Sequence, residues 1–189
     1  TIEKTKSLQP DRLAFYSYAH VPWIKGNGQR GFKDDDVPKD EKKRMFNTDA
    51  SPVMNKIWSI GGKTGWYYGN ILWRIRGFMD KLVGGVGLRR GRTNNTTIDA
   101  GDALDFWRVL VADKKAMRLL LYAEMKLPGE AWLEFQITPV EDNFELKQTA
   151  TFRPKGVWGR LYWYGSWPFH YFIFNGMINK LSKGKEDKN

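Results

Sequence analysis

Apolar side chains recur at two different spacings along the chain, and the two spacings predict different elements. One stretch, 66–83, has the three- and four-residue spacing of a helix, with apolar positions at Leu72, Ile75, Met79 and Leu82. Four later runs predict strands. The first of them alternates and is rich in Trp, Phe and Val. These runs are 103–111, 117–127, 131–140 and 144–152.

The links between the predicted strands are short. Pro128-Gly129 is a turn signal between the second and third runs, and Asp142-Asn143 is one between the third and fourth. Strands joined by such short links pair with their neighbours in opposite directions. The four runs therefore predict an antiparallel meander.

Signals before the first long helix predict a shorter one. Residues 44–47 are consistent with a short strand, after which Asp49 or Ser51 is a suitable helix N-cap. Gly61-Gly62 then marks the end of that helix. The chain thus begins its folded part with a strand followed by two short helices.

The last apolar segment predicts one long helix over 156–182. Pro168 lies inside it, so we expect a kink there. Its apolar residues near one face are Leu161, Tyr164, Phe169, Phe172, Ile173, Met177 and Leu181. The segment is long enough for a membrane span, but its glycines, Pro168 and His170 argue against one. Peripheral membrane contact through Trp158, Trp163 and Trp167 is an open alternative.

Three regions differ in composition along the 189 residues. Residues 1–43 are polar and predict an extension with little core, poorly structured or foreign to the rest. Residues 44–183 carry the periodic segments and predict one domain, and 184–189 form a basic tail.

Six motifs in this order resemble the domain-of-unknown-function family 2867, of the START-like or Bet v 1-like superfamily. They are IGGKTGW at 60–66, LWRIRGFMDKLVGGVGLRRGR at 72–92, GDALDFWRV at 101–109, AEMKLPGEAWLEF at 123–135, QTATFRPKGVWGRLYWY at 148–164 and PFHYFIFNGM at 168–177. The resemblance implies an α+β helix-grip fold, in which a curved antiparallel sheet wraps around a long C-terminal helix and a cavity lies between them. In that family the domain often follows an NAD(P)-binding, epimerase-like domain of the short-chain dehydrogenase type. An accessory role in such an oxidoreductase is therefore an alternative to ligand binding.

Residues 9–33 resemble a different family, a short segment of oxygen-independent coproporphyrinogen III oxidase. The cluster of that radical enzyme needs a Cys triad, and this chain has no cysteine. The resemblance therefore assigns no such chemistry to His20 or Arg30. A natural fusion and an artefact would each explain why this segment precedes the domain.

Composition narrows the possible chemistry. Without cysteine there are no disulfides, thiolate nucleophiles or Cys-ligated metals, and His20 and His170 lie too far apart in the sequence to suggest a metal site. We expect no cofactor. The net charge of +10 lies largely in the polar ends, so no specific nucleic-acid partner is expected. The simplest location for such a protein is the cytoplasm.

Heavy aromatic content, with nine Trp, eight Tyr and eleven Phe, predicts either a dense core or an aromatic-lined cavity. We expect a small hydrophobic ligand in that cavity and no catalytic activity in this chain alone, because no recognisable catalytic constellation is present. A pair such as Glu124 and Glu134 could do acid–base work, or form ion pairs with Arg108 or Arg118. The cavity candidates are Trp107, Tyr122, Glu124, Trp132, Glu134, Tyr164 and His170.

A glycine-rich loop carries a compact group of cations, Arg89, Arg90 and Arg92. Its glycines follow a helix and not a strand, so the loop does not have the context of a dinucleotide-binding fingerprint. Guanidinium groups suit an anion or an acidic partner, which makes a basic interaction module a further alternative. Ion pairs with Asp99, Asp102 or Asp105 are the structural interpretation of the same residues.

Overall fold

The computed structural model describes residues 37–47, 49–82, 84–85, 87, 91–92 and 97–183. The chain divides into two compact units, Thr1–Val37 and Pro38–Asn189. The second unit contains all of the helices and strands described below. Residues 9–33, with their resemblance to coproporphyrinogen III oxidase, lie outside the described residues.

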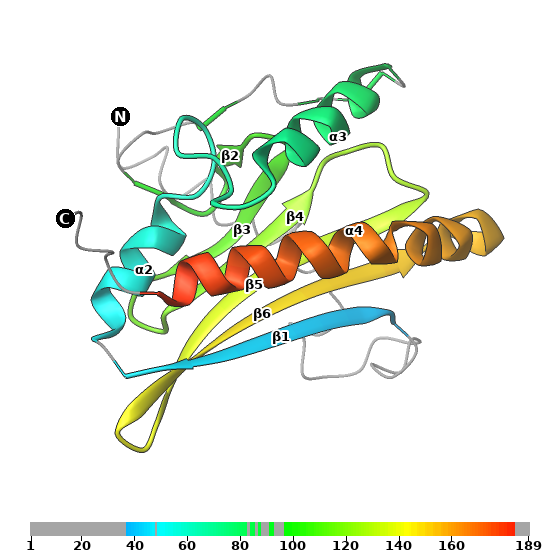
Figure 1. The fold of residues 1–189 in the computed structure, drawn as a ribbon. Helices are drawn as coiled ribbons and strands as arrows, with labels where there is room; N and C mark the ends of the chain where they lie inside the picture. Colours follow the sequence, from blue (N-terminus) through cyan, green and yellow to red (C-terminus); the bar gives the residue numbers. More distant parts are fainter. Residues whose placement is uncertain are drawn as a thin grey trace, which may run out of the picture. The chain divides into compact units, whose positions relative to one another are not determined.

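Six strands form one antiparallel sheet in the order β1-β6-β5-β4-β3-β2. Figure 1 shows that the sheet is twisted and curved. Its longest pair is the hairpin of β5 and β6, in which twelve residues of each strand are paired. The strands are β1 (Lys39–Phe46), β2 (Ala103–Leu104), β3 (Trp107–Asp113), β4 (Arg118–Ala123), β5 (Gly129–Val140) and β6 (Asn143–Pro154).

The three described helices pack on one face of this sheet. They are α2 (Ala50–Trp58), α3 (Asn70–Leu82) and α4 (Gly156–Ser182). One buried cluster contains residues of all three helices and all six strands. Asp49 is the N-cap of α2, and its side chain accepts a hydrogen bond from the backbone N–H of Ser51. The strand, two helices, meander and final helix confirm the predicted α+β helix-grip fold.

Strand β1 is longer than the sequence predicts. It begins at Lys39 and pairs with β6 over its whole length, whereas the prediction placed a short strand at 44–47. The run of Lys, Asp and Glu in 39–43 concealed it, because charged residues are typical of edge strands and also of solvated extensions. The folded unit therefore begins about five residues before the predicted boundary at 44.

Trp66, in the link between α2 and α3, lies at the centre of the aromatic core. Its ring centroid lies 5.1 Å from that of Trp73 and 6.0 Å from that of Trp107. Its indole Nε1–H donates a hydrogen bond of 2.9 Å to Oδ2 of buried Asp105. Burial raises the pKa of Asp105, and the bond from Trp66 opposes that rise. The link thereby fixes the start of α3 against β3.

The two faces of β5 have different surroundings. Leu133, Phe135 and Ile137 belong to the buried cluster beneath the helices. Trp132 and Glu134 alternate with them and so point to the other face. This distinction decides which of the predicted side chains can reach the space between sheet and helices.

Helix α3 is buried along a side that the spacing of its apolar residues does not mark. Trp73, Gly77 and Asp80 are buried, while Ile75, Met79 and several other apolar residues of the helix are exposed. The large Trp73 ring packs against Trp66, and the Asp80 carboxylate accepts hydrogen bonds from the backbone N–H groups of Gly87 and Lys126. The spacing of apolar residues alone could not reveal that Trp73 and Asp80 are buried.

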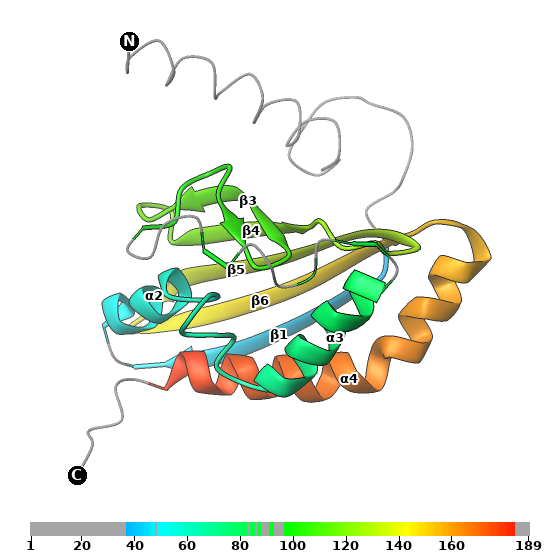
Figure 2. The ribbon, with the colours of Figure 1, turned by 90° about the horizontal axis from the view of Figure 1, so that it is seen from above.

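Helix α4 crosses the concave side of the sheet as one continuous helix with Pro168 inside it. Figure 2 shows that its N-terminal part runs in a different direction from its C-terminal part, as the proline predicts. The C-terminal part is anchored by buried Ile173, Met177 and Leu181. The N-terminal part diverges from α3, which leaves space between the two helices and the sheet.

Candidate ligand-binding site

A cavity of about 450 Å³ lies between the sheet, α3 and α4. Residues Leu72 to Met79 of α3 form one wall and residues Tyr162 to Phe174 of α4 form another. Ala131 on β5 and Ala150 on β6 contribute to the sheet side, and their small side chains leave room above the strands. The predicted space between sheet and C-terminal helix is therefore present.

The walls are mostly aromatic and aliphatic. Phe152 and Trp163 stack with ring centroids 5.7 Å apart, and they join the sheet to the N-terminal part of α4. Trp73 and Phe174, with centroids 6.3 Å apart, join α3 to the C-terminal part of α4. An apolar molecule entering the cavity would therefore exchange water for hydrocarbon and aromatic surface on nearly every side.

His170 supplies the main polar group on the α4 wall. Its ring lies edge-on to Trp163 at 5.2 Å and tilted against Phe174 at 5.1 Å. Its pKa is lowered from 6.5 to about 4, chiefly by burial; nearby Asp40 opposes the shift and Arg76 adds to it. At neutral pH the imidazole is therefore uncharged, and it can offer a hydrogen bond without a buried charge.

Arg76 is the only charged residue in the described lining of the cavity. Its guanidinium lies 5.8 Å from the ring centroid of Tyr162, in the range of a cation–π contact between α3 and α4. Ser166 and Thr151 are the other polar residues of the lining. Polar groups are thus few in the lining.

Three nitrogen atoms of lining residues are buried without a hydrogen-bond partner in the described part of the chain. They are Nε1 of Trp73, Nε1 of Trp107 and Nδ1 of His170. Buried polar atoms are usually paired, so such a group of exceptions requires an explanation.

Three of the seven predicted cavity residues, Trp107, Trp132 and His170, border this space. Trp132 belongs to the lining although its ring lies on the other face of the sheet, where it packs against Tyr122 with centroids 5.6 Å apart. Tyr122 is not in the lining. Tyr164 lies on α4 but points to the exterior and is 71% exposed.

The two predicted carboxylates also lie away from the cavity. Glu124 pairs with Arg108 at 3.0 Å, and Glu134 pairs with Arg118 at 2.6 Å. These are the ion pairs that the sequence offered as the alternative to acid–base chemistry. Strand alternation separated the two faces correctly but could not tell which face was the inner one.

Arg92 serves the fold in this structure. Its guanidinium donates hydrogen bonds to the backbone oxygens of Trp58, Ile60 and Thr97, and so ties the end of α2 to the segment before β2. Burial lowers its pKa, while nearby Asp102 opposes that shift. Arg89 and Arg90 lie outside the described residues, so their predicted contact with an anion or a partner stays a prediction.

The sequence missed the contribution of α3 and the aromatic pair at the start of α4. Trp73, Phe152 and Trp163 are large lining residues, yet none was a candidate. A usable signal existed for Trp163, since it lies seven positions before His170, which is two turns of the same helix. No comparable signal marked Trp73, because its burial depends on the path of the chain around Trp66.

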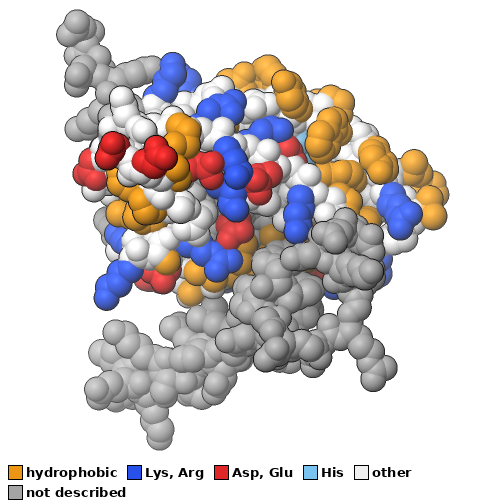
Figure 3. Space-filling view, turned by 90° about the horizontal axis from the view of Figure 1, so that it is seen from below, with side chains coloured by type: hydrophobic (Ala, Val, Ile, Leu, Met, Phe, Trp, Pro, Cys, Tyr) orange, Lys and Arg blue, Asp and Glu red, His pale blue; other side chains and the backbone are white. Residues whose placement is uncertain are grey.

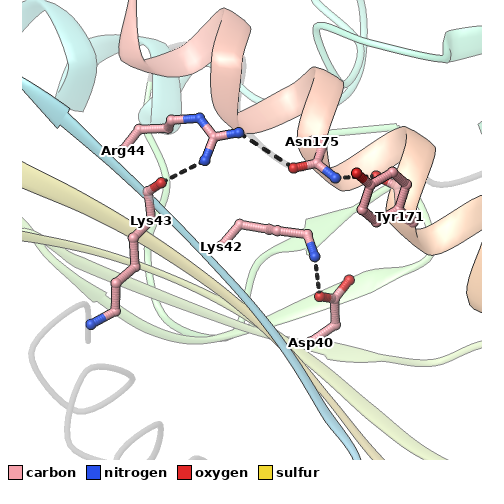
Figure 4. A network of polar contacts seen from close by, with 6 residues as sticks. All are labelled: Asp40, Lys42, Lys43, Arg44, Tyr171 and Asn175. Carbon is pink, nitrogen blue, oxygen red and sulfur yellow. Dashed lines mark hydrogen bonds and ion pairs between the residues drawn. The ribbon is translucent and has the colours of Figure 1, made fainter.

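A second, more open hollow lies between β1 and the C-terminal half of α4. It is lined by Arg44, Tyr68, Tyr171, Phe172, Asn175, Gly176, Asn179, Lys180 and Lys183. Figure 4 shows how Arg44 reaches from β1 to Asn175 on α4, while Lys42 pairs with Asp40 beneath them. Arg44 also donates to Asn179 Oδ1 at 2.6 Å. These bonds hold strand and helix together and leave the apolar cavity as the stronger candidate site.

No group of three or more His, Cys, Asp or Glu side chains in the described residues could hold a metal ion. No helix in the same part of the chain is long and apolar enough to cross a membrane.

Solved structures with a similar fold share little sequence with this chain. A protein from Nitrosospira multiformis has a TM-score of 0.51 and 7% identity, with 77% of this chain and 94% of that chain covered. Norcoclaurine synthase from Thalictrum flavum has a TM-score of 0.47 and 8% identity, covering 82% and 93%. A Thermobifida fusca protein has a TM-score of 0.45 and 13% identity, covering 76% and 90%. The first of these supports the fold alone.

No curated protein matches the sequence. Nothing in the comparisons supports an NAD(P)-binding partner domain, or the resemblance of residues 9–33 to coproporphyrinogen III oxidase. A family model does match residues 39–177, which contain both β1 and the cavity. This match confirms the resemblance carried by the six motifs, and the chain belongs to the family described as protein of unknown function, DUF2867.

Proposed function

We propose that the domain binds one small, largely apolar molecule with a single polar end in the cavity between the sheet, α3 and α4. The observation that carries this proposal is the cavity itself. Its volume of about 450 Å³ lies within the range of roughly 300–1,000 Å³ that is common for small-molecule sites. Well-packed cores seldom leave a void larger than a water molecule, so a space of this size favours binding.

The distribution of polar groups in the lining suggests how the ligand would be oriented. Most of the lining is apolar, so the body of the molecule would lie against Phe152, Ile173 and the two alanines. The neutral imidazole of His170, on the α4 wall, would meet its polar end. A few polar groups in an apolar pocket are the usual means of fixing orientation.

Cavity filling tests the proposal directly. The double variant A131F/A150L adds side-chain bulk from two strands into existing space, so it should fold and exclude the ligand. A116F is the matched control, because Ala116 lies exposed in the turn between β3 and β4, away from the cavity. The assay is native mass spectrometry after incubation with palmitate, a monoterpene and a sterol.

We expect the wild-type chain and A116F to retain one molecule of at least one compound per chain. A131F/A150L should retain at most a tenth as much, with an unchanged circular dichroism spectrum. Equal retention by A131F/A150L would place the ligand elsewhere and contradict the proposal. Failure of the wild-type protein to retain any of the compounds at saturating concentration would contradict it as well.

A further inference from the structure

The outer faces of α3 and α4 are apolar where a water-facing helix is normally polar. On α3 the exposed residues at helical spacing form one stripe along the helix. This stripe consists of Ile71, Ile75, Phe78 and Leu82. Leu82 is 71% exposed, so these side chains do not pack against the described core.

The N-terminal part of α4 has the same character. Trp163 faces inward with only 4% of its surface exposed, whereas Trp158 is 78% exposed. Other exposed apolar residues in this part of the helix are Leu161, Tyr164, Trp167 and Phe169. Figure 3 shows hydrophobic side chains gathered on the side of the molecule where α4 begins, with Lys and Arg side chains among them.

The two apolar faces meet at the mouth of the cavity. Ile75 and Met79 of α3 and Phe169 of α4 both line the cavity and are about half exposed. The cavity therefore opens between the two helices, through a rim that is itself apolar. Exposed apolar surface of this extent on a domain indicates a docking site.

The charged residues near the apolar faces of α3 and α4 indicate what kind of partner would bind there. The exposed charged residues of α3 are cations, Arg74 and Lys81, and Arg160 lies on the first turns of α4. The only acidic residue in either helix is Asp80, which is fully buried. Large aromatic and aliphatic side chains mixed with Arg and Lys, with no exposed acid, are typical of helices that lie in the interface of an anionic membrane.

We propose that the outer faces of α3 and α4 dock on the surface of an anionic lipid bilayer, with the cavity mouth turned toward the lipid. This goes beyond ligand binding, because docking depends on side chains that point away from the cavity. An apolar ligand could then pass between bilayer and cavity without crossing water, and burial of the exposed aromatic side chains would stabilise the docked state.

Vesicle co-sedimentation tests the docking. Vesicles of phosphatidylcholine with phosphatidylserine should bind the wild-type chain, and vesicles of phosphatidylcholine alone should bind it much less. F78S/W158S removes one exposed aromatic from each helix, so its partition coefficient should fall roughly tenfold or more. M45S is the matched control, because Met45 is an exposed apolar residue on β1, and its binding should match the wild type.

Charge variants test the electrostatic contribution to membrane docking. R74Q and R160Q should each weaken binding to the anionic vesicles by about fivefold, since one cation near such a surface contributes about 1 kcal/mol. Raised salt should weaken wild-type binding in the same direction. The cavity variant A131F/A150L should still bind vesicles, so a failure of ligand binding and a failure of docking can be told apart.

Three results would overturn the inference. One is wild-type protein that sediments with neither kind of vesicle. The second is F78S/W158S that binds as well as wild type. The third is self-association of the wild-type chain without lipid, measured by analytical ultracentrifugation and abolished in F78S/W158S, which would make this face a contact between two copies.

Discussion

His170 is buried among aromatic rings, and this burial changes its ionisation. It is surrounded by Trp163 and Phe174, and burial lowers its pKa to about 4. A neutral imidazole can donate or accept a hydrogen bond inside an apolar wall without the cost of a buried charge. The residue thus fits the polar end of an otherwise apolar ligand at neutral pH.

The same pKa shift predicts how stability depends on pH. Between pH 6.5 and about 4 the unfolded chain binds a proton at His170 and the folded chain does not. Stability from this group is therefore complete above pH 6.5 and is lost as the pH falls toward 4, by roughly 3 kcal/mol in total. Urea unfolding of the wild type and of H170F across this range measures it.

H170F has no group that titrates at this position, so its free energy of unfolding should fall less steeply over the same interval. The difference between the two curves isolates His170 from the carboxylates, which titrate in both proteins. Parallel curves would contradict the assigned shift.

At the scale of the element, two glycines of α4 have different surroundings. Gly165 lines the cavity mouth, and a Cβ added there would contact nothing within 4 Å. At Gly176 a Cβ would clash with the ring of Tyr68, which packs directly on the helix. One glycine thus only weakens the helix, while the other permits close packing.

These surroundings predict opposite effects of the same substitution. G165A should raise the free energy of unfolding by about 0.5–1 kcal/mol, because alanine loses less backbone entropy than glycine in a helix. G176A should lower it by roughly 1–3 kcal/mol, since Tyr68 must move. Chemical denaturation of both variants gives the comparison, and a stabilised G176A would mean that Tyr68 does not pack there.

Elements were easier to predict from the sequence than their orientations. Pro128-Gly129 and the alternating runs on either side of it fixed the meander, because turn chemistry and strand periodicity are local properties. The buried side of α3 could not be predicted, since the burial of Trp73 and Asp80 depends on partners from distant segments. Glu124 and Glu134 were misplaced for a similar reason, because alternation does not say which face the helices cover.

The family resemblance predicted the cavity, whereas the aromatic content was equally consistent with a dense core. Its volume depends on how far α4 lies from the sheet, and on the small residues Ala131 and Ala150 beneath it. It also depends on the bend of α4 around Pro168. A kink was predictable from the proline, but the space that the bend leaves beside α3 was not.

At the scale of the whole molecule, a rigid sheet and two diverging helices enclose a space that the protein does not fill. The C-terminal part of α4 closes the core through Met177 and Leu181, both fully buried. Its N-terminal part and α3 bound the opening and expose apolar side chains around it. Closed packing at one end and an open apolar mouth at the other suit a domain that receives and holds a molecule.

The most direct test observes a ligand inside the cavity. In protein labelled with ¹³C at alanine methyl groups, Ala131 and Ala150 lie in the cavity wall and Ala116 lies outside it. With palmitate added, NMR should show intermolecular nuclear Overhauser effects from the ligand chain to the methyl groups of Ala131 and Ala150, and none to Ala116. Bound palmitate without any such contact to Ala131 or Ala150 would contradict the account.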